Sequence, residues 1–432
     1  MKQPTKRSDW KPAFLLIAPS ILLILAIAIY PVVQSFYYSL FDLRLNEPTK
    51  SATHLDYSLN LDVYLKYYPF LVNDLSQEIE QTQDPLKSKL ADINQELKEL
   101  NQSIKEDAGD TYEKVNQMLN QYKTPPEELA LVSISGETAS QFKETIADVN
   151  DRLSNLKNQK GLSNADELTG LASGLPDAII EPNFIGLDHY FNMFTNGRTW
   201  SALWHTFVFT VVSVAAEFTI GFAIALLINK PFKGRGMIRA SVLIPWAIPT
   251  AVSATMWTYL YDGQSGIIAG FFEFIGIVPD MSTLLTTGTG AMFAVILTDV
   301  WKTTPYIALL LLAGLQVIPQ NLYEAASIDG AGKVKQFFNI TLPLMKSSIL
   351  VALLFRTLDA FRVFDLVYVL TGGGPANTTE MISGFAYQVM FSQQNFGAGS
   401  TLAIIVFLCV AVISIIYIKF LGSDLLSDDS GR

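Results

Sequence analysis

The chain has 432 residues, half of them apolar, and a formal net charge of −10 at neutral pH. This length and apolar share are typical of an integral membrane protein. The sequence has no basic patch with interleaved aromatic residues, so nucleic-acid binding is not indicated. A single cysteine, Cys409, excludes an intramolecular disulfide.

The negative charge is concentrated in one block of the chain. Residues 47–183 contain 24 acidic and 12 basic residues, whereas the rest of the chain contains 16 acidic and 18 basic ones. We therefore expect a soluble acidic block and a slightly basic apolar remainder. The histidines His54, His189 and His205 show no ligand spacing, so metal binding is not supported.

A basic segment and a long apolar run begin the chain. Residues 1–13 include four basic side chains, and the run that starts at Phe14 is about twenty residues long. At 1.5 Å per residue, this run can cross the hydrocarbon of a bilayer. A cleaved signal peptide is the alternative, because Ala26-Ile-Ala28 offers a cleavage site. Since the run continues past that point, we expect an uncleaved first transmembrane helix within 14–45, preceded by a cytoplasmic segment, 1–13.

Residues 46–183 show a different pattern. In two stretches, apolar residues recur at alternating four- and three-residue steps. The first stretch has Leu86, Leu90, Ile93, Leu97, Leu100 and Ile104, and the second has Phe142, Ile146, Val149, Leu153 and Leu156. This period of about 3.5 predicts helices that share a narrow coiled-coil seam. Breaks at Gly109, Pro125-Pro126 and Gly136 predict a helical hairpin or small bundle, and 161–182 is expected to be a return linker. A solvated spacer without a partner is the alternative to a contact surface.

Five further apolar runs follow within residues 184–425, each long enough to span a membrane. They are approximately Trp204–Ile228, Ile238–Tyr261, Gly290–Val317, Ile349–Leu370 and Ser400–Phe420. The run Gly266–Val278 is too short to span, and we expect it at the interface or against the bundle. The sequence thus predicts an all-α membrane protein with six transmembrane helices and an inserted helical, coiled-coil-like domain.

The distribution of basic residues predicts the orientation. Lysines and arginines cluster at 230–239 and 333–346, whereas 262–289 and 371–399 contain none. Because positive residues collect on the cytoplasmic side, we expect both termini, including a 426–432 tail, and the 319–346 loop to be cytoplasmic. The acidic 46–183 block is then extracytoplasmic.

Polar residues within the predicted spans are costly and usually face a bundle interior or a cavity. Asp299, Lys302, Thr303 and Tyr306 recur at three- and four-residue steps and therefore share one helix face. Arg356 and Asp359 are spaced i, i+3, and Arg362 and Asp365 repeat that spacing. Pro245 and Pro249 bracket Trp246, and Thr250 lies one turn further on. Such a set offers hydrogen-bond partners and aromatic plates for a sugar. Ion pairs that lock helices together are the alternative, and the spacing does not decide between them.

The 319–346 loop is patterned as a helix, a turn and a second helix. Asn321–Ile328 is expected to be helical, Asp329-Gly330 is a turn dipeptide, and a second short helix has Val334, Phe337, Phe338 and Ile340 as its apolar side. Gly330-Ala-Gly-Lys333 does not satisfy the phosphate-loop pattern, so it does not predict ATP binding. From the residues alone an ordinary cytoplasmic connector remains an alternative.

Four motifs in the apolar regions resemble binding-protein-dependent ABC importers. Glu324-Ala-Ala, Asp329-Gly-Ala and Ile340-Thr-Leu-Pro resemble their EAA loop, and Gly372-Gly-Gly-Pro with Asn377-Thr-Thr resembles a loop of their carbohydrate permeases. Ile244–Pro249 and Phe184–Tyr190 are similar to two further segments of these permeases. The resemblance covers 1–45 and 184–425 and is closest to permeases of the maltose, trehalose and glycerol-phosphate type.

The resemblance implies the permease fold of type I ABC importers and a transport subunit rather than an enzyme. It implies a second permease, two ATPase subunits that bind ATP and Mg²⁺, an extracytoplasmic binding protein and a location in the inner membrane among lipids. No cofactor is expected in this chain itself. Transport by alternating access would be coupled through Glu324, Ala325, Ala326, Asp329, Gly330 and Ala331. Gly372, Gly373, Gly374 and Pro375 would dock the binding protein or, alternatively, form only a tight turn.

The positions that match the sugar pocket of maltose-type permeases are Trp246, Thr250, Asp299, Lys302, Thr303, Tyr306, Arg356 and Ala360, and we add Asp359 to them. This chain is more charged than that pattern at Asp299, Lys302 and Arg356, which argues against maltodextrin. Because acids accompany the bases, a small neutral carbohydrate or glycoside is expected, such as a di- or oligosaccharide or a glycosylated polyol. An importer of a glycerol-phosphate-like anion and a membrane-anchored sensor or scaffold are the alternatives.

Overall fold

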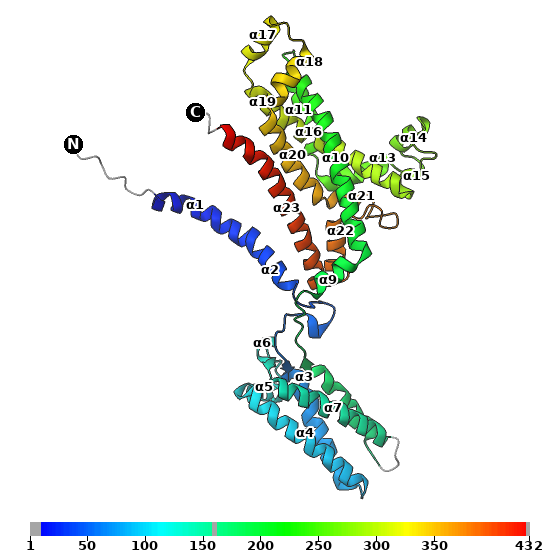
Figure 1. Cartoon of the computed structure of the whole chain (residues 1–432). Helices are drawn as coiled ribbons and strands as arrows, with labels where there is room; N and C mark the ends of the chain where they lie inside the picture. Colours follow the sequence, from blue (N-terminus) through cyan, green and yellow to red (C-terminus); the bar gives the residue numbers. More distant parts are fainter. Residues whose placement is uncertain (1–9, 158–161, 429–432) are drawn as a thin grey trace, which may run out of the picture. The chain divides into compact units, whose positions relative to one another are not determined.

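The computed structural model describes residues 10–157 and 162–428, which form two compact units (Figure 1). The insertion unit is Leu40–Gly186, and the membrane unit combines the described residues before Leu40 with those after Gly186. Most of the predicted cytoplasmic segment 1–13, the end of the 426–432 tail and the start of the predicted linker at Gly161 lie outside the described residues.

The insertion unit is mainly helical. Its helices and strands are β1 (Ser58–Asn60), α3 (Leu61–Gln81), α4 (Leu86–Ala108), α5 (Asp110–Asn120), α6 (Glu127–Ala130), β2 (Leu131–Ser133), α7 (Gly136–Lys157), α8 (Ala165–Gly174) and β3 (Ile179–Ile180). The predicted seam residues of α4 and α7 are buried except Leu86, which is partly buried, and Leu90, Ile93 and Leu97 are fully enclosed. The helices predicted from the 3.5-residue period are therefore confirmed.

Two expectations for the insertion unit were wrong. Three short strands form an antiparallel sheet in the order β2-β1-β3, so the unit is not purely helical. The expected return linker contains the helix α8, because Leu168, Ala172 and Leu175 follow helical spacing and bury their side chains in the core. A glycine- and serine-rich composition concealed this short amphipathic pattern.

The membrane unit consists of helices. These are α1 (Trp10–Ile24), α2 (Tyr30–Tyr38), α9 (Asp188–Thr195), α10 (Gly197–Asn229), α11 (Arg235–Val242), α12 (Ile244–Ala247), α13 (Thr250–Leu260), α14 (Ile267–Phe274), α15 (Thr283–Thr286), α16 (Gly288–Val317), α17 (Gln320–Ile328), α18 (Lys333–Gln336), α19 (Leu342–Leu344), α20 (Lys346–Phe361), α21 (Asp365–Leu370), α22 (Ile382–Tyr387) and α23 (Phe396–Asp428). π-Helical turns occur at Leu25–Ile29, Phe337–Thr341 and Gln388–Ser392.

Four helices in the described residues are long and apolar enough to cross a membrane. They are Phe14–Tyr38, Gly197–Asn229, Gly288–Val317 and Phe396–Phe420. A fifth candidate is the pair Lys333–Leu344 and Lys346–Phe361, which is bent by 66°. Two of the six predicted spans, the third and the fifth, are therefore broken into shorter helices.

Prolines break the third predicted span, Ile238–Tyr261. Its residues fall into α11, α12 and α13, and Ile248 is extended with φ −72° and ψ 133°. A residue before proline is pushed out of the helical region, and a proline cannot donate the helical hydrogen bond. Pro249 therefore ends α12 and starts α13 in a new direction.

Packing overrides helix continuity in the fifth predicted span, Ile349–Leu370. α20 ends at Phe361, and α21 begins at Asp365. Leu366, Val367 and Leu370 are buried in a core that also contains residues of α13. α21 thus packs on α13 (Figure 1) rather than continuing the axis of α20.

Small residues bring the central helices close together. A methyl group added to Gly221 of α10 would lie 3.0 Å from Ile307 of α16, and one on Gly314 of α16 would lie 2.6 Å from Ser348 of α20. Such contacts are typical of membrane helix interfaces. α10, α16 and α20 therefore form the tightly packed core that holds the polar residues described below.

Candidate functional site

A buried cluster of charged side chains joins α10, α16 and α20. Nη2 of Arg356 donates a hydrogen bond to Oε1 of Glu217 at 2.9 Å, and the same guanidinium contacts Glu217 Oε2 and Asp299 Oδ2. The side chains of Arg356, Glu217 and Asp299 are 2%, 0% and 6% exposed. An arginine held by two carboxylates on different helices ties the three helices together.

Two other predicted residues border this charge cluster. The hydroxyl of Thr303 donates to Glu217 Oε1 at 2.6 Å, and Asp359 Oδ2 accepts from Arg356 Nη1 at 3.0 Å. The Asp359 side chain is 63% exposed, whereas the predicted pocket residue Ala360 is fully buried. Among the acids that contact Arg356, Asp359 is thus the accessible one in the described residues.

Glu217 was missed by the sequence analysis. It lies in the middle of α10, within a run that otherwise looks uniformly apolar. The available signal was this single acid at mid-span, because an ionisable residue at such a position needs a buried partner. Helical spacing within one segment does not show that partner, since Arg356 lies 139 residues further along the chain.

Lys302 stabilises the proline break. Its Nζ donates to the carbonyl oxygen of Ile248 at 2.6 Å and lies 3.5 Å from that of Trp246. Helix ends leave carbonyl groups without helical partners, and these two carbonyls lie where α12 ends. Lys302 of α16 therefore fixes the direction of the α12–α13 segment.

Two aromatic rings meet beside this break. Trp246 of α12 and Tyr306 of α16 stack with ring centroids 5.6 Å apart and planes inclined by 16°. Trp246 remains 48% exposed, and Thr250 begins α13 one turn further on. The predicted site residues thus form two groups, one around Arg356 and one around the Trp246–Tyr306 pair. The groups adjoin because Thr303 belongs to the first, Lys302 to the second, and the two are neighbours on α16.

The predicted repeat of the i, i+3 pair at Arg362 and Asp365 was wrong. Arg362 lies just past the end of α20, and Asp365 is the first residue of α21. No ion pair joins these two side chains, both of which belong to the described part of the chain. The spacing argument fails here because it requires an unbroken helix.

The 319–346 loop contains a well-formed helix end. Gly330 has φ +78° and donates its N–H to Ser327 O at 3.1 Å, while Ala331 donates to Ala326 O at 2.9 Å. These bonds form a Schellman motif, in which the position after the helix is left-handed and favours glycine. The predicted turn at Asp329-Gly330 is confirmed.

Side-chain contacts hold the two arms of this loop together. Gln336 Nε2 donates to Ser327 Oγ at 2.8 Å, and Tyr323 OH lies 2.9 Å from Thr341 Oγ1. The predicted coupling residues Glu324, Ala325, Asp329 and Gly330 are exposed, and Ala326 and Ala331 are partly buried. Several apolar side chains also face outward, and these are Ile328 (86% exposed), Val334 (72%) and Phe338 (59%).

The loop of residues 371–381 curls back on itself. Gly372 and Gly373 have φ +59° and +86°, Asn377 has φ +62°, and the Gly374–Pro375 peptide is cis. Thr371 Oγ1 lies 2.8 Å from Thr379 Oγ1, and Arg198 of α10 binds Glu380 through two hydrogen bonds of 2.8 and 2.7 Å. The loop is therefore fixed at both ends.

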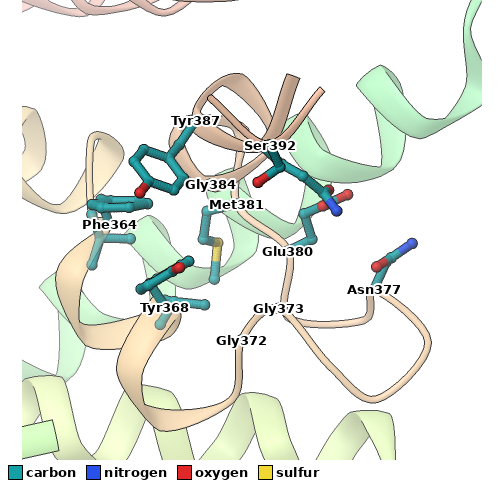
Figure 2. A pocket seen from close by; sticks show the side chains of 13 residues that line it. Phe364, Tyr368, Gly372, Gly373, Asn377, Glu380, Met381, Gly384, Tyr387 and Ser392 are labelled. Atoms are coloured by element: carbon teal, nitrogen blue, oxygen red, sulfur yellow. The ribbon is translucent and has the colours of Figure 1, made fainter. Parts of the chain in front are cut away.

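A pocket of about 140 Å³ lies between α21, this loop and α22 (Figure 2). Phe364, Tyr368 and Tyr387 line one side, and polar side chains that include Asn377, Glu380 and Ser392 line the other. Met381 is 1% exposed and forms part of the lining between them. We call this cavity the outer pocket.

Comparisons with a protein family and with individual relatives both match this chain to transport-system permeases. Residues 217–423 match the family described as the binding-protein-dependent transport system inner membrane component. The chain is 45% identical over 241 residues to a trehalose/maltose transport system permease protein of Thermococcus litoralis, covering 56% of this chain and 81% of that one. It is 38% identical over 251 residues to a sulfoquinovosyl glycerol transport system permease protein of Agrobacterium fabrum, covering 58% and 79%.

A solved structure supports the fold. A bacterial ABC transporter involved in the import of the acidic polysaccharide alginate contains a chain that aligns with a TM-score of 0.51 at 20% identity. The alignment covers 72% of this chain and 98% of that one. The prediction that the apolar regions have the fold of an ABC importer permease is therefore confirmed.

Proposed function

Because the chain belongs to the family of binding-protein-dependent transport system inner membrane components, we propose that it imports a small, uncharged glycoside by alternating access. As a permease subunit of an ABC importer it is a multi-pass inner-membrane protein and not an enzyme. The charge balance around its predicted substrate residues is the observation that carries the choice of substrate.

That balance opposes an anionic substrate. Within the polar region of α10, α16 and α20, three carboxyl groups accompany two cations. Arg356 is bound by carboxylates, and Lys302 is held by backbone carbonyls, so each cation already has acceptors. A phosphate or sulfonate would require cations in excess of the acids.

The relatives support a sugar-like substrate. One is named for trehalose and maltose, which are uncharged, and the other for sulfoquinovosyl glycerol, whose sugar carries a sulfonate. Both names support a sugar, and only the first supports an uncharged one. Stacked aromatic rings at Trp246 and Tyr306 suit the C–H face of a pyranose, and the exposed Asp359 suits its hydroxyl groups. We therefore assign substrate contact to these three residues in the conformation described.

The buried members of the predicted pocket have another role in this proposal. Arg356, Asp299 and Glu217 act as a lock between α10, α16 and α20, and they rearrange when the site opens to the other side. Removing one partner of a buried ion pair costs about 3–5 kcal/mol. Such a lock favours a small number of discrete conformations over continuous deformation.

The 319–346 loop transmits the energy of ATP hydrolysis in this proposal. Its exposed apolar side chains Ile328, Val334 and Phe338 provide a docking face for an ATPase subunit, and Glu324 anchors α17 within it. The hydrogen bonds between the two arms make the loop stiff enough to carry a displacement to α16 and α20. Alternating access then follows as the membrane helices rock around the binding site.

We place both termini and this loop in the cytoplasm, and the insertion unit on the outside, according to the basic residues. The complex includes a second permease, two ATPase subunits that bind ATP and Mg²⁺, and a binding protein that docks at Gly372–Pro375. The insertion unit contacts either the binding protein or the second permease.

The role of the insertion unit is testable because its two ends meet. Asp42 donates its N–H to Asn183 O at 2.8 Å, and the rings of Phe41 and Phe184 lie 5.3 Å apart. Residues 45–181 are therefore replaceable by a short glycine linker without stretching the chain. We expect the deletion to lower uptake but to preserve basal ATPase activity of the complex, whereas unchanged uptake would make the unit a spacer.

The proposed substrate is tested by uptake into proteoliposomes that contain the complete complex. Trehalose, maltose, a glucosylated glycerol and glycerol 3-phosphate are compared as substrates and as competitors. Uptake of a neutral glycoside supports the proposal. Uptake of glycerol 3-phosphate alone would contradict it.

A further inference from the structure

The outer pocket has two chemically different sides. Phe364 and Tyr368 stack with centroids 5.2 Å apart, and Tyr387 lies 4.9 Å from Phe364 and 5.4 Å from Tyr368. This aromatic side faces Asn377, Glu380 and Ser392 across the cavity (Figure 2). Tyr368 is 54% exposed, so part of the aromatic surface is open to a ligand.

Arg198 holds Glu380, on the polar side of the pocket, in place. Arg198 donates to both carboxylate oxygens of Glu380, and it also contacts the amide oxygen of Gln388. Its guanidinium stacks 4.6 Å from the ring centroid of Phe385. Glu380, which is 7% exposed, is thus neutralised and oriented before any ligand binds.

The charge of the pocket selects against anions. Its 13 lining residues, all in the described part of the chain, include no lysine or arginine, and the carboxylate of Glu380 is paired with Arg198. Tyrosine, asparagine, glutamine and serine provide hydrogen-bonding groups. These are the groups that bind sugar hydroxyls, while aromatic faces bind sugar C–H groups.

The size of the pocket suits a ligand portion of about one sugar ring. A cavity of about 140 Å³ holds on the order of ten water-sized atoms, close to the dozen or so non-hydrogen atoms of one hexose.

We propose that the outer pocket is a second sugar site, which binds one uncharged pyranose ring of the transported glycoside separately from the Trp246–Tyr306 region. This inference rests on the proposed function, because it assumes a glycoside as substrate. By the predicted orientation the 371–381 loop is extracytoplasmic, so the site holds the sugar between its release by the binding protein and its passage into the membrane.

Gly384 offers a precise way to fill the pocket. It lines the cavity, and a methyl group added to it meets no heavy atom within 4 Å. Gly384→Leu therefore directs a side chain into the cavity from a position where its first carbon meets no neighbouring atom. Ser383→Leu is the matched control, because Ser383 is on the same helix but does not line the pocket. Tyr368→Ala, at an exposed position, is a second variant that removes an aromatic contact.

The test uses photo-crosslinking of the complete complex with diazirine derivatives of trehalose, maltose and a glucosylated glycerol. We expect a labelled peptide within 363–392, protected by the unmodified glycoside but not by glycerol 3-phosphate. Gly384→Leu should reduce this label at least tenfold and raise the KM of uptake, Tyr368→Ala should reduce the label severalfold, and Ser383→Leu should change neither.

Two negative results are distinguishable. If the wild-type complex takes up a neutral glycoside but labelling is confined to 244–306, or is unaffected by Gly384→Leu, the outer pocket is not a sugar site, although the proposed function stands. If no neutral glycoside is taken up and none labels the chain, the proposed function fails and this inference fails with it.

Discussion

Arg356 of α20 hydrogen-bonds to Glu217 of α10, with Nη2 and Oε1 2.9 Å apart, where both side chains are almost completely buried. The two residues are 139 positions apart in the sequence. Because α16 contributes Asp299 to the same guanidinium, one cation fixes the arrangement of three membrane helices.

The charge cluster predicts a rank order of stability among its variants. Arg356→Met leaves two buried carboxylates without their cation and should cost about 3–5 kcal/mol. Glu217→Gln keeps a hydrogen-bonding group at the same place and should cost less. Thermal unfolding of the purified chain measures both, and Arg362→Met, at an exposed arginine just beyond α20, is the matched control. Equal stability of Arg356→Met and the control would refute the lock.

Lys302 should control the geometry of the broken helix. Lys302→Met removes the donor to Ile248 O, and a hydrogen bond from a charged group contributes about 1.5–3 kcal/mol. We expect lower uptake, together with faster modification of a cysteine introduced at Thr250, because the start of α13 is released. Wild-type modification rates in this variant would show that the prolines alone hold the break.

The coupling turn depends on backbone conformation at one glycine. Gly330 has φ +78°, where a side chain costs roughly 1–2 kcal/mol, whereas Gly332 has φ −68°. An added methyl group has open space at both positions. Gly330→Val should therefore reduce ATPase stimulation by the binding protein and Gly332→Val should not. Identical stimulation in the two variants would argue against a coupling role for the turn.

The insertion unit should lose stability in acid. Burial raises the pKa of Asp42, but hydrogen bonds from Lys50 and Arg44, each 2.7 Å long, outweigh burial and hold the pKa below its ordinary value. A lowered folded-state pKa gives stability that is present above the ordinary aspartate value of about 3.9 and is lost as the pH falls through the folded pKa.

This acid sensitivity is measured by thermal unfolding of the full chain between pH 7 and pH 3. Asp42→Asn should flatten part of the pH dependence, whereas Asp56→Asn, at an exposed carboxyl group in the same segment, should leave it as in the wild type. The same pH dependence in Asp42→Asn and the wild type would assign the acid sensitivity to other groups.

Local patterns predicted much of this fold. The 3.5-residue period identified α4 and α7, and Asp329-Gly330 identified the coupling turn, because both depend on residues close in sequence. Family resemblance supplied the permease fold. The short α8 was missed because its composition resembles a linker.

Long-range contacts were beyond the reach of spacing arguments. Pro245 and Pro249 were recognised in the third apolar run, but the run was still treated as a single span. The partnership of Glu217 with Arg356 joins separate helices, so no periodicity within either helix contains it. Lys302 lies on the predicted face of α16 with Asp299 and Tyr306, yet its acceptors are backbone carbonyls that lack helical partners only because the helix breaks.

The most direct test of the central claim is the ATPase activity of the reconstituted complex in the presence of its binding protein and a panel of glycosides, polyols and glycerol 3-phosphate. We predict that a neutral glycoside stimulates hydrolysis and that glycerol 3-phosphate does not. Stimulation by the phosphate alone, or by no member of the panel in a folded complex, would contradict the account.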